Sequence, residues 1–287
     1  MFYSSVYAFG NRVYLFGGCV FPLSDRLTNS VVSFDIVNKE WHSLSPCIED
    51  YDQNTPPPIC DSLICYHKDC LYILGGRQAD AVYVNTMYKF CMKTTTWTTV
   101  PQVGPKPLID RKIFGTIFKN QFYIFGGSLT RGKNRFRDVS VFDFSTNRWS
   151  TRETYSKNQH YPNDRTQESM AFSSKFGYMG GGKIPNTNMY FFDIWKFNLE
   201  TLEWFQLDYT LNSNIRQHSM CIVDECCLYT FGGFRPHAAR FESFEMFIVQ
   251  PLTLYSQCLK SICRSPNKSS LVKRLPAAIL NDLNLDK

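Results

Sequence analysis

The sequence lacks the features that mark several common classes of protein. No run approaches the roughly 20 apolar residues that cross a bilayer. The start of the chain has no basic region followed by an apolar run, so no secretory signal is expected. Its 16 glycines and 14 prolines are too few for a collagen-like or low-complexity chain. These absences predict a globular protein of the cytoplasm or nucleus with no membrane partner.

Disulfide and metal-binding patterns are also missing. The 11 cysteines are odd in number and include no Cys-x-x-Cys pair, and the five histidines include no His-x-x-x-His pair. Several cysteines lie inside apolar strand-like runs, which is typical of reduced, buried thiols in an intracellular protein. We therefore expect no disulfide framework, no metal site and no cofactor.

Charge and length constrain the chain only weakly. The 31 basic and 25 acidic side chains give a net charge of +6, spread along the sequence. This balance permits an acidic partner but does not argue for nucleic acid. The hydrophobic share of 44% is too large for a disordered chain. A length of 287 residues has room for a sizeable core.

An internal repeat dominates the sequence. An apolar run that ends in a double glycine recurs at intervals of about 50 to 60 residues. The five copies end at Gly17-Gly18, Gly75-Gly76, Gly126-Gly127, Gly181-Gly182 and Gly232-Gly233. A second feature keeps the same phase, because a Phe precedes a Trp by seven residues at Phe34/Trp41, Phe90/Trp97, Phe142/Trp149 and Phe197/Trp204. Two features in phase indicate a repeated structural unit.

Each unit predicts four short strands. An apolar run precedes each double-glycine run, at residues 5–9, 62–66, 114–118, 169–173 and 219–223. A third run follows, and the Trp begins a fourth. Strand-length runs with polar turns and no helical periodicity indicate antiparallel all-β units.

A period of about 50 residues with this pattern is the kelch signature of a β-propeller blade. The double glycine lets the second strand end in a sharp turn, and the Trp is large enough to fill the space between neighbouring blades. We therefore expect an all-β kelch propeller over residues 1–252. Five repeats are visible and the fifth is incomplete, because Leu254 stands where its Trp would be expected. Either the ring closes differently here or the chain lacks one unit.

The tail, residues 253–287, follows a helical pattern. One stripe of a first helix carries Leu254, Cys258 and Ile262. After a polar loop, a second helix with proline in its first turn is predicted on Leu275, Pro276, Ile279 and Leu283. Two helices that cover the bottom of the propeller would also explain this amphipathicity.

The tail carries a more specific resemblance. The run Thr-Leu-x-x-x-Cys-x-x-x-Ile resembles the elongin-C-binding BC box, and the Leu-Pro-x-x-Ile-x-x-x-Leu run resembles the cullin-2-type box that follows it. With the repeats, they make the chain similar to the kelch-repeat substrate receptors of cullin-2/elongin-BC ubiquitin ligases, whose rings usually have six blades. The resemblance implies elongin B/C, cullin-2 and degron-bearing substrate proteins as partners. It assigns elongin binding to Leu254, Cys258 and Ile262, and cullin binding to Leu275, Pro276, Ile279 and Leu283.

Basic residues of the repeats are expected to converge at one face of the propeller. Blade topology brings residues after the double glycine and residues shortly before the inner strand to the same face, where binding groups concentrate. The candidate ligand-binding residues are Arg77, Lys183, Arg235, Arg111, Arg165 and Arg216, with Ser169 and Ser219 just inside a central channel. Several guanidinium groups around a funnel favour a carboxylate or phosphate. The resemblance gives this meaning, since related receptors capture the free C-terminal carboxylate of proteins that end in glycine, a C-degron.

Other interpretations stay open at this stage. The arginines could be solvated, or could pair with Asp61, Asp110, Asp164 and Glu168. The protein could be a non-catalytic kelch scaffold without a ligase role, which would need no BC box. The basic run of the tail has no aromatic residues beside it, so it favours a solvated face over nucleic-acid binding.

Catalysis is disfavoured. The five histidines fall at unlike positions of the repeats, and no glycine-rich phosphate loop is present. His218 enters an inner strand and could face the channel, where a lone histidine is more often a hydrogen-bonding group than a metal ligand. We therefore expect a non-catalytic receptor subunit and not an enzyme.

Overall fold

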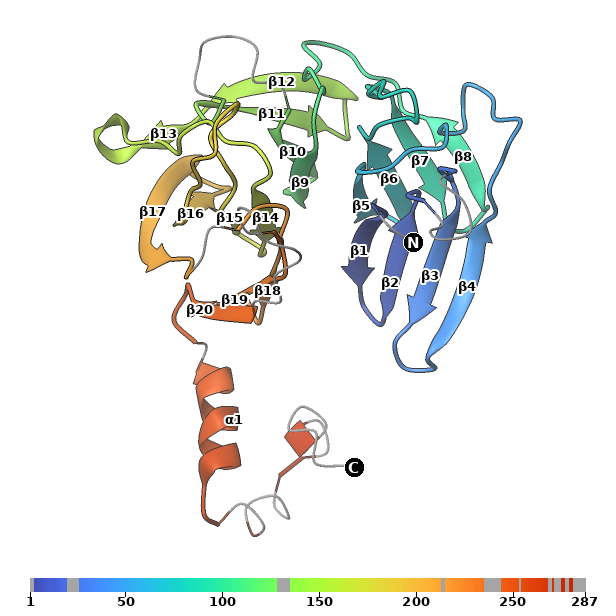
Figure 1. Ribbon diagram of the computed structural model, residues 1–287. Helices are drawn as coiled ribbons and strands as arrows, with labels where there is room; N and C mark the ends of the chain where they lie inside the picture. Colours follow the sequence, from blue (N-terminus) through green and yellow to red (C-terminus); the bar gives the residue numbers. More distant parts are fainter. Residues whose placement is uncertain are drawn as a thin grey trace.

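The computed structural model describes residues 3–19, 26–127, 135–212, 215–234, 244–252, 254–267, 270, 275–276 and 279–280. Within these residues the strands form five separate sheets arranged as the blades of a β-propeller (Figure 1). The predicted all-β propeller with five repeats is confirmed. The predicted fourth strands do begin at the tryptophans, as in Glu40–Ser45 and Glu203–Thr210.

The first three blades have four antiparallel strands each, in chain order across the sheet. The first blade holds β1 (Ser5–Phe9), β2 (Arg12–Phe16), β3 (Val31–Asp35) and β4 (Glu40–Ser45). The second holds β5 (Leu63–His67), β6 (Cys70–Leu74), β7 (Met87–Cys91) and β8 (Thr96–Thr99). The third holds β9 (Ile113–Phe118), β10 (Gln121–Gly126), β11 (Asp138–Asp143) and β12 (Arg148–Glu153).

The last two blades depart from this pattern. The fourth holds β14 (Ser169–Phe172), β15 (Phe176–Gly180), β16 (Asp193–Asn198) and β17 (Glu203–Thr210), and β13 (Tyr155–Ser156) pairs in parallel with the outer edge of β17. A short 3-10 turn, η1, spans Lys157–Gln159. Among the described residues, the fifth blade has only β18 (Ser219–Val223), β19 (Cys227–Phe231) and β20 (Phe244–Ile248). The predicted incomplete fifth repeat is therefore confirmed.

The double glycines bring each second strand close to the segment that leads into the next blade. Gly17 has a φ of +63°, and a Cβ on it would lie 2.4 Å from the carbonyl oxygen of Ile59. A side chain there would both strain the backbone and collide with it. The following Gly18 donates its N–H to the same Ile59 oxygen at 2.8 Å. Only glycine allows this close approach.

The repeated tryptophans fill the junctions between blades, as predicted. The indole N–H of Trp97 donates to Ser45 Oγ at 3.1 Å, and that of Trp149 donates to Gln102 Oε1 at 2.8 Å. The indole N–H of Trp204 donates to the Phe136 carbonyl at 3.0 Å. Each acceptor belongs to the preceding blade, and Trp149 and Trp204 are each only 1% exposed. Each of these three junctions is thus closed by one large ring with a satisfied polar atom.

The ring stays open between its last and first blades. The inner strands β1, β5, β9, β14 and β18 contact one another in that order, but among the described strands β18 and β1 make no comparable contact. Trp41 of the first blade is accordingly 63% exposed, and Phe244 of the fifth is 68% exposed. Figure 1 shows these two blades on opposite sides of an opening. Among the described strands the structure shows five sheets in an unclosed ring, whereas the sequence predicts either a different closure or a missing unit.

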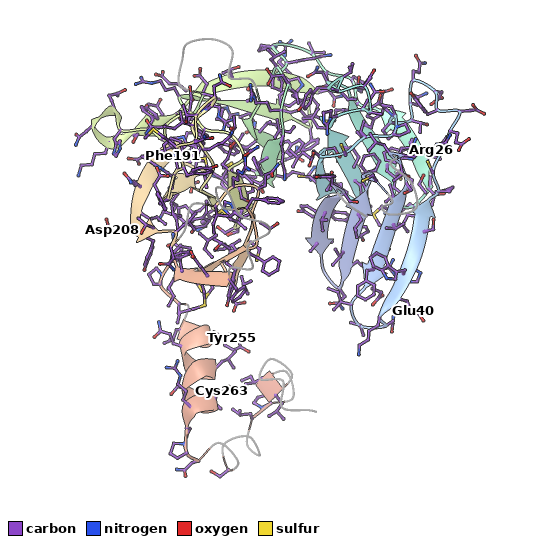
Figure 2. All side chains as sticks on the ribbon, viewed as in Figure 1. Arg26, Glu40, Phe191, Asp208, Tyr255 and Cys263 are labelled. Carbon is purple, nitrogen blue, oxygen red and sulfur yellow. The ribbon has the colours of Figure 1, made fainter. Side chains whose placement is uncertain are left out.

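The tail begins with α1 (Leu254–Arg264), which projects from the fifth blade away from the sheets (Figure 1). Figure 2 shows Tyr255 at the end of this helix nearer the blades and Cys263 toward its far end. The first predicted tail helix is confirmed, and it does not cover the bottom of the propeller. Among the described residues, no helix has both the length and the apolar character needed to cross a membrane.

Candidate functional site at the propeller mouth

A cavity of about 880 Å³ opens where the segments leading into the inner strands meet. It draws residues from all five blades. Its polar and charged lining includes Tyr3, Asp61, Arg111, Lys112, Arg135, Asp164, Gln167, Glu168, Lys183, Gln217, His218 and Ser219. The predicted channel mouth therefore exists as a single concave site.

One position recurs around this cavity in every blade. Tyr3, Asp61, Arg111, Gln167 and Gln217 each stand two residues before an inner strand, and all five line the cavity. The φ angles of Tyr3, Asp61, Gln167 and Gln217 are 58°, 55°, 63° and 55°. A left-handed residue turns the chain sharply at the same point of the repeat. The propeller thus presents five different side chains from one equivalent position.

Backbone pairing fixes these segments to the residues after the double glycines. Cys60 and Arg77 exchange two backbone hydrogen bonds of 3.0 and 2.9 Å, and Thr166 and Lys183 exchange two of 2.9 and 2.8 Å. The two sets predicted to share one face are therefore bonded to each other. The site rests on a rigid scaffold, which favours specific binding.

The charges of the cavity are mixed. Arg111, Lys112 and Lys183 are basic lining residues, whereas Arg135 is held by an ion pair with the buried Glu168. Arg135 also donates to the Arg165 carbonyl at 2.6 Å. The central carbon of its planar guanidinium lies over the Phe136 ring, 4.8 Å from the ring centroid. Because Arg135 is occupied within the fold, the lining cations left to meet a ligand among the described residues are Arg111, Lys112 and Lys183.

Asp61 is an acidic lining residue whose carboxyl group interacts with the charges of Lys112 and Arg77. Burial raises the pKa of its carboxyl, and the charges of Lys112 and Arg77 oppose that rise. A carboxyl whose pKa is raised neutralises more readily than an exposed one. Asp61 therefore repels an anion in the cavity less than a fully ionised carboxylate would.

His218 contributes unsatisfied hydrogen-bonding capacity. Its side chain is buried against Gly181, and neither ring nitrogen has a hydrogen-bond partner. Burial, and to a smaller extent the Lys112 charge, lowers the pKa of His218 to about 4. At neutral pH it is an uncharged imidazole that can donate one hydrogen bond and accept another. Unpartnered buried polar groups are costly, so a ligand that reaches them gains affinity.

Three of the predicted ligand-binding residues line the cavity, namely Arg111, Lys183 and Ser219. The Nε atom of Arg111 is buried without a hydrogen-bond partner and lies 3.6 Å from Asp110 Oδ1. The pairing of Arg111 with Asp110 that the sequence left open is therefore loose. Arg111 is the guanidinium best placed to bind a ligand.

Arg165 does not line the cavity. Its side chain is 0% exposed, and its two terminal nitrogens donate to the two carboxylate oxygens of Asp193 at 2.6 and 2.9 Å. The guanidinium also lies over the Phe191 ring at 4.0 Å. Burial would raise the pKa of Asp193, but the hydrogen bonds and charge of Arg165 outweigh it and lower the pKa. Arg165 holds the fourth blade together and is not available to a ligand.

The remaining predicted residues lie beside the cavity or beyond the described part of the chain. Arg216 donates to Gln167 Oε1 at 3.5 Å, so it supports a lining residue. Arg77 reaches Cys60, and Ser169 is buried at the start of β14. Arg235 lies outside the described residues.

The residues predicted from the sequence do not include Lys112, Gln167 or Gln217, which line the cavity. Each lies one or two positions before an inner strand, so this shared position of the repeat is the signal that points to them. His218, which the sequence suggests could face the channel, also lines the cavity. Within the described part of the chain, no cluster of three His, Cys, Asp or Glu side chains could hold a metal ion.

The predicted tail residues are partly visible. Leu254 is 78% exposed on α1, Cys258 on the same helix is exposed, and Ile262 is half-buried. Near the end of the chain the N–H groups of Ile279 and Leu280 donate to the Pro276 carbonyl at 3.0 and 3.1 Å, which is one helical turn. Leu275 is half-buried, and Leu283 lies outside the described residues.

Comparison with known proteins agrees with the repeat analysis. A family model described as the KLHDC2/KLHL20/DRC7 Kelch-repeats domain matches residues 4–233. Kelch domain-containing protein 10 of Rattus norvegicus is 24% identical over 269 residues, covering 91% of this chain and 64% of the relative. The Homo sapiens protein of that name is also 24% identical, with 91% and 59% covered. Kelch domain-containing protein 3 of Homo sapiens is 26% identical over 257 residues, with 82% and 63% covered. The chain thus spans only 59 to 64% of the length of these relatives.

Proposed function

Because this chain belongs to the KLHDC2/KLHL20/DRC7 kelch-repeat family, we propose that it is a protein-recognition subunit, and more specifically a substrate receptor of a cullin-RING ubiquitin ligase. Its propeller mouth would bind the free C-terminal carboxylate of target proteins that end in glycine. Its tail would bind elongin C, with elongin B, and cullin-2. The chain would then supply proximity between a target and a ubiquitin-carrying enzyme.

The observation that carries the mouth assignment is the set of unpartnered donors in one cavity. Arg111 Nε and the His218 ring lack hydrogen-bond partners, and the Lys112 and Lys183 ammonium groups stand beside them. Donors of this kind suit a carboxylate, which accepts up to two bonds at each oxygen. A terminal glycine has no side chain, so its carboxylate can reach deep donors without steric conflict.

A peptide series tests this assignment. We expect a peptide with a free C-terminal glycine to bind the full-length protein, and its C-terminal amide to bind at least about tenfold more weakly, because a charge-assisted hydrogen bond is lost. Arg111→Met should weaken the free acid by a similar factor. Fluorescence anisotropy measures both affinities.

The matched control is Arg148→Met, which removes an exposed arginine on β12 outside the cavity. It should leave the affinity unchanged. Equal binding of the acid and the amide would exclude the carboxylate as the recognised group, whatever the tail does.

Exposure of the tail helix supports elongin binding. Leu254 and Cys258 both face solvent on a helix that projects from the propeller. A large apolar side chain held in water by a separate helix is typical of a docking surface. No described residue of α1 lines the cavity at the mouth, so each of the two surfaces can bind its own partner.

Co-purification from cell extract tests the tail. Leu254→Ala combined with Cys258→Phe should remove elongins B and C and cullin-2 from the proteins recovered. The first change deletes the exposed leucine side chain, and the second places a bulky ring one helical turn away. Cys263→Ala is the control, since Cys263 is exposed on the opposite side of α1. If the double variant still recovers elongins, or if the unaltered protein recovers none, the ligase role is excluded and the protein is a kelch scaffold.

A further inference from the structure

Two cysteines of the second blade lie opposite one another across neighbouring strands. Cys70 is the first residue of β6, Cys91 is the last residue of β7, and the two are Cα partners in the antiparallel ladder. Both are half-buried, so each can be reached from solvent. They lie at the end of the blade opposite the mouth, because β5 runs from the mouth to the turn that precedes Cys70.

The ladder geometry brings the two thiols close. The next pair along the ladder is hydrogen-bonded, with the Met92 N–H donating to the Asp69 carbonyl at 3.0 Å. Hydrogen-bonded and non-hydrogen-bonded pairs alternate in an antiparallel ladder, so Cys70 and Cys91 form a non-hydrogen-bonded pair. Such pairs have a Cα separation of about 4.5 Å, which lies within the range that a disulfide bond spans.

The surroundings of Cys91 favour its thiolate. The Thr94 hydroxyl, the backbone N–H groups of Thr94 and Lys93, and the Cys70 thiol lower the pKa of Cys91 to about 7. Burial, followed by the neighbouring Cys91, raises the pKa of Cys70. The charged groups around the pair are Lys89, Lys93 and Asp69. One thiol is therefore activated as a nucleophile and the other stays protonated beside it.

We propose that Cys70 and Cys91 are a redox-sensitive pair that hydrogen peroxide oxidises to a cross-strand disulfide. The Cys91 thiolate attacks one peroxide oxygen, so that an S–O bond forms, the O–O bond breaks, and the departing hydroxide takes a proton to become water. The Cys70 sulfur then attacks the Cys91 sulfur of the sulfenic acid. The S–S bond forms, the S–O bond breaks, and the hydroxide leaves with the Cys70 proton as a second water.

Other cysteines do not offer the same arrangement. Cys226 and Cys227 have sulfurs 3.6 Å apart, but they are adjacent in the chain and both are buried. Burial raises the pKa of the Cys65 thiol, which lies in the core. Among the described cysteines, only Cys70 and Cys91 are cross-strand partners that are both accessible to solvent, with the pKa of one of them, Cys91, lowered.

Peptide mapping of the full-length protein tests the pair. After peroxide treatment at pH 7 and alkylation, we expect a linked peptide that contains Cys70 and Cys91, lighter by two hydrogen atoms than the reduced pair. Dithiothreitol should reverse it. In untreated protein, the rate of Cys91 alkylation should reach half its maximum near pH 7, which follows from its pKa of about 7.

Two variants separate the steps. Cys70→Ser should leave Cys91 as a sulfenic acid that dimedone labels, because the second thiol is missing. Cys91→Ser should leave Cys70 reduced at the same peroxide dose. Cys47→Ser, which changes an exposed cysteine in another blade, should form the linked peptide as the unaltered protein does.

The proposal is overturned if peroxide leaves Cys70 and Cys91 separately alkylated in the unaltered protein. It is also overturned if Cys70→Ser and the unaltered protein give the same products. Neither result bears on the mouth or the tail, since the pair lies at the other end of the second blade and uses none of their residues.

Discussion

The residue directly before each inner strand shows how one repeat position can serve different purposes. Ser62, Lys112, Glu168 and His218 occupy this position in four successive blades. Ser62 accepts a hydrogen bond from Ser5 through its carbonyl at 2.5 Å, and Glu168 pairs with Arg135. Lys112 and His218 line the cavity, and neither ring nitrogen of His218 has a hydrogen-bond partner. The first pair stabilises the ring, and the second leaves binding capacity at its centre.

His218 makes stability depend on pH. Its pKa is about 4 in the folded protein and about 6.5 in an unfolded chain, so between these values the unfolded state binds a proton that the folded state does not. Stability therefore falls as pH drops from 6.5 to 4, by about 3 kcal/mol from this group. Urea unfolding at a series of pH values should show a shallower loss for His218→Gln. His160→Gln, which changes an exposed imidazole, should follow the unaltered protein, and parallel curves for all three would contradict the assignment.

The arginines show what sequence reasoning could and could not reach at this scale. Their convergence near the mouth was predictable, because the repeat fixes where each loop lies. Their roles were not, since Arg165 and Arg111 occupy similar places before an inner strand. Only the side chain of Asp193, from a strand later in the same blade, commits Arg165 to the core. The nearest carboxylate of Arg111 is 3.6 Å away, so Arg111 stays available.

At the scale of elements, the Phe–Trp pair links each blade to the one before it. Phe197 and Trp204 face one another across β16 and β17, and Phe125 of the third blade packs against both rings. The same pair in the first blade, Phe34 and Trp41, has its Trp in solvent. The same Phe–Trp pair therefore contributes more to the stability of the fourth blade than to that of the first, because a preceding sheet packs against it only in the fourth.

Truncating the two tryptophans measures this difference. Trp204→Ala should lower the free energy of unfolding by about 3 to 5 kcal/mol, since it leaves a cavity in a fully buried junction and removes the indole hydrogen bond to the Phe136 carbonyl. Trp41→Ala should lower it by only about 0.5 kcal/mol, because its ring is 63% exposed. Guanidinium unfolding followed by circular dichroism gives both values. A large loss for Trp41→Ala would mean that something covers the first blade in solution.

At the scale of the whole molecule, the propeller and the tail behave as separate parts. The hydrophobic clusters lie between successive blades, and the described residues of α1 belong to none of them. The domain boundary at residue 252 was predicted from the change of pattern alone. The sequence left open whether a five-unit ring closes, because it shows how many units exist but not how far they bend around the centre.

Removing the tail tests this separation. A chain of residues 1–252 should keep the melting temperature of the full protein within about 2 °C, because it loses few buried contacts. It should also keep its affinity for the free-acid peptide while losing elongin recovery. Differential scanning calorimetry checks the first expectation. A drop of many degrees would show that the tail docks on the propeller and would revise the boundary.

The sequence by itself determined the number of units, the order of strands within each and the face on which the blade-connecting loops gather. It could do so because period-two alternation and double glycines are local requirements that repeat in phase. Only the tertiary structure decided which cations face the cavity, which tryptophans are buried and whether the ring closes. Those outcomes depend on contacts between side chains of different strands and blades. The energy of such a contact depends on both segments and their relative position, so it cannot be derived from either segment alone.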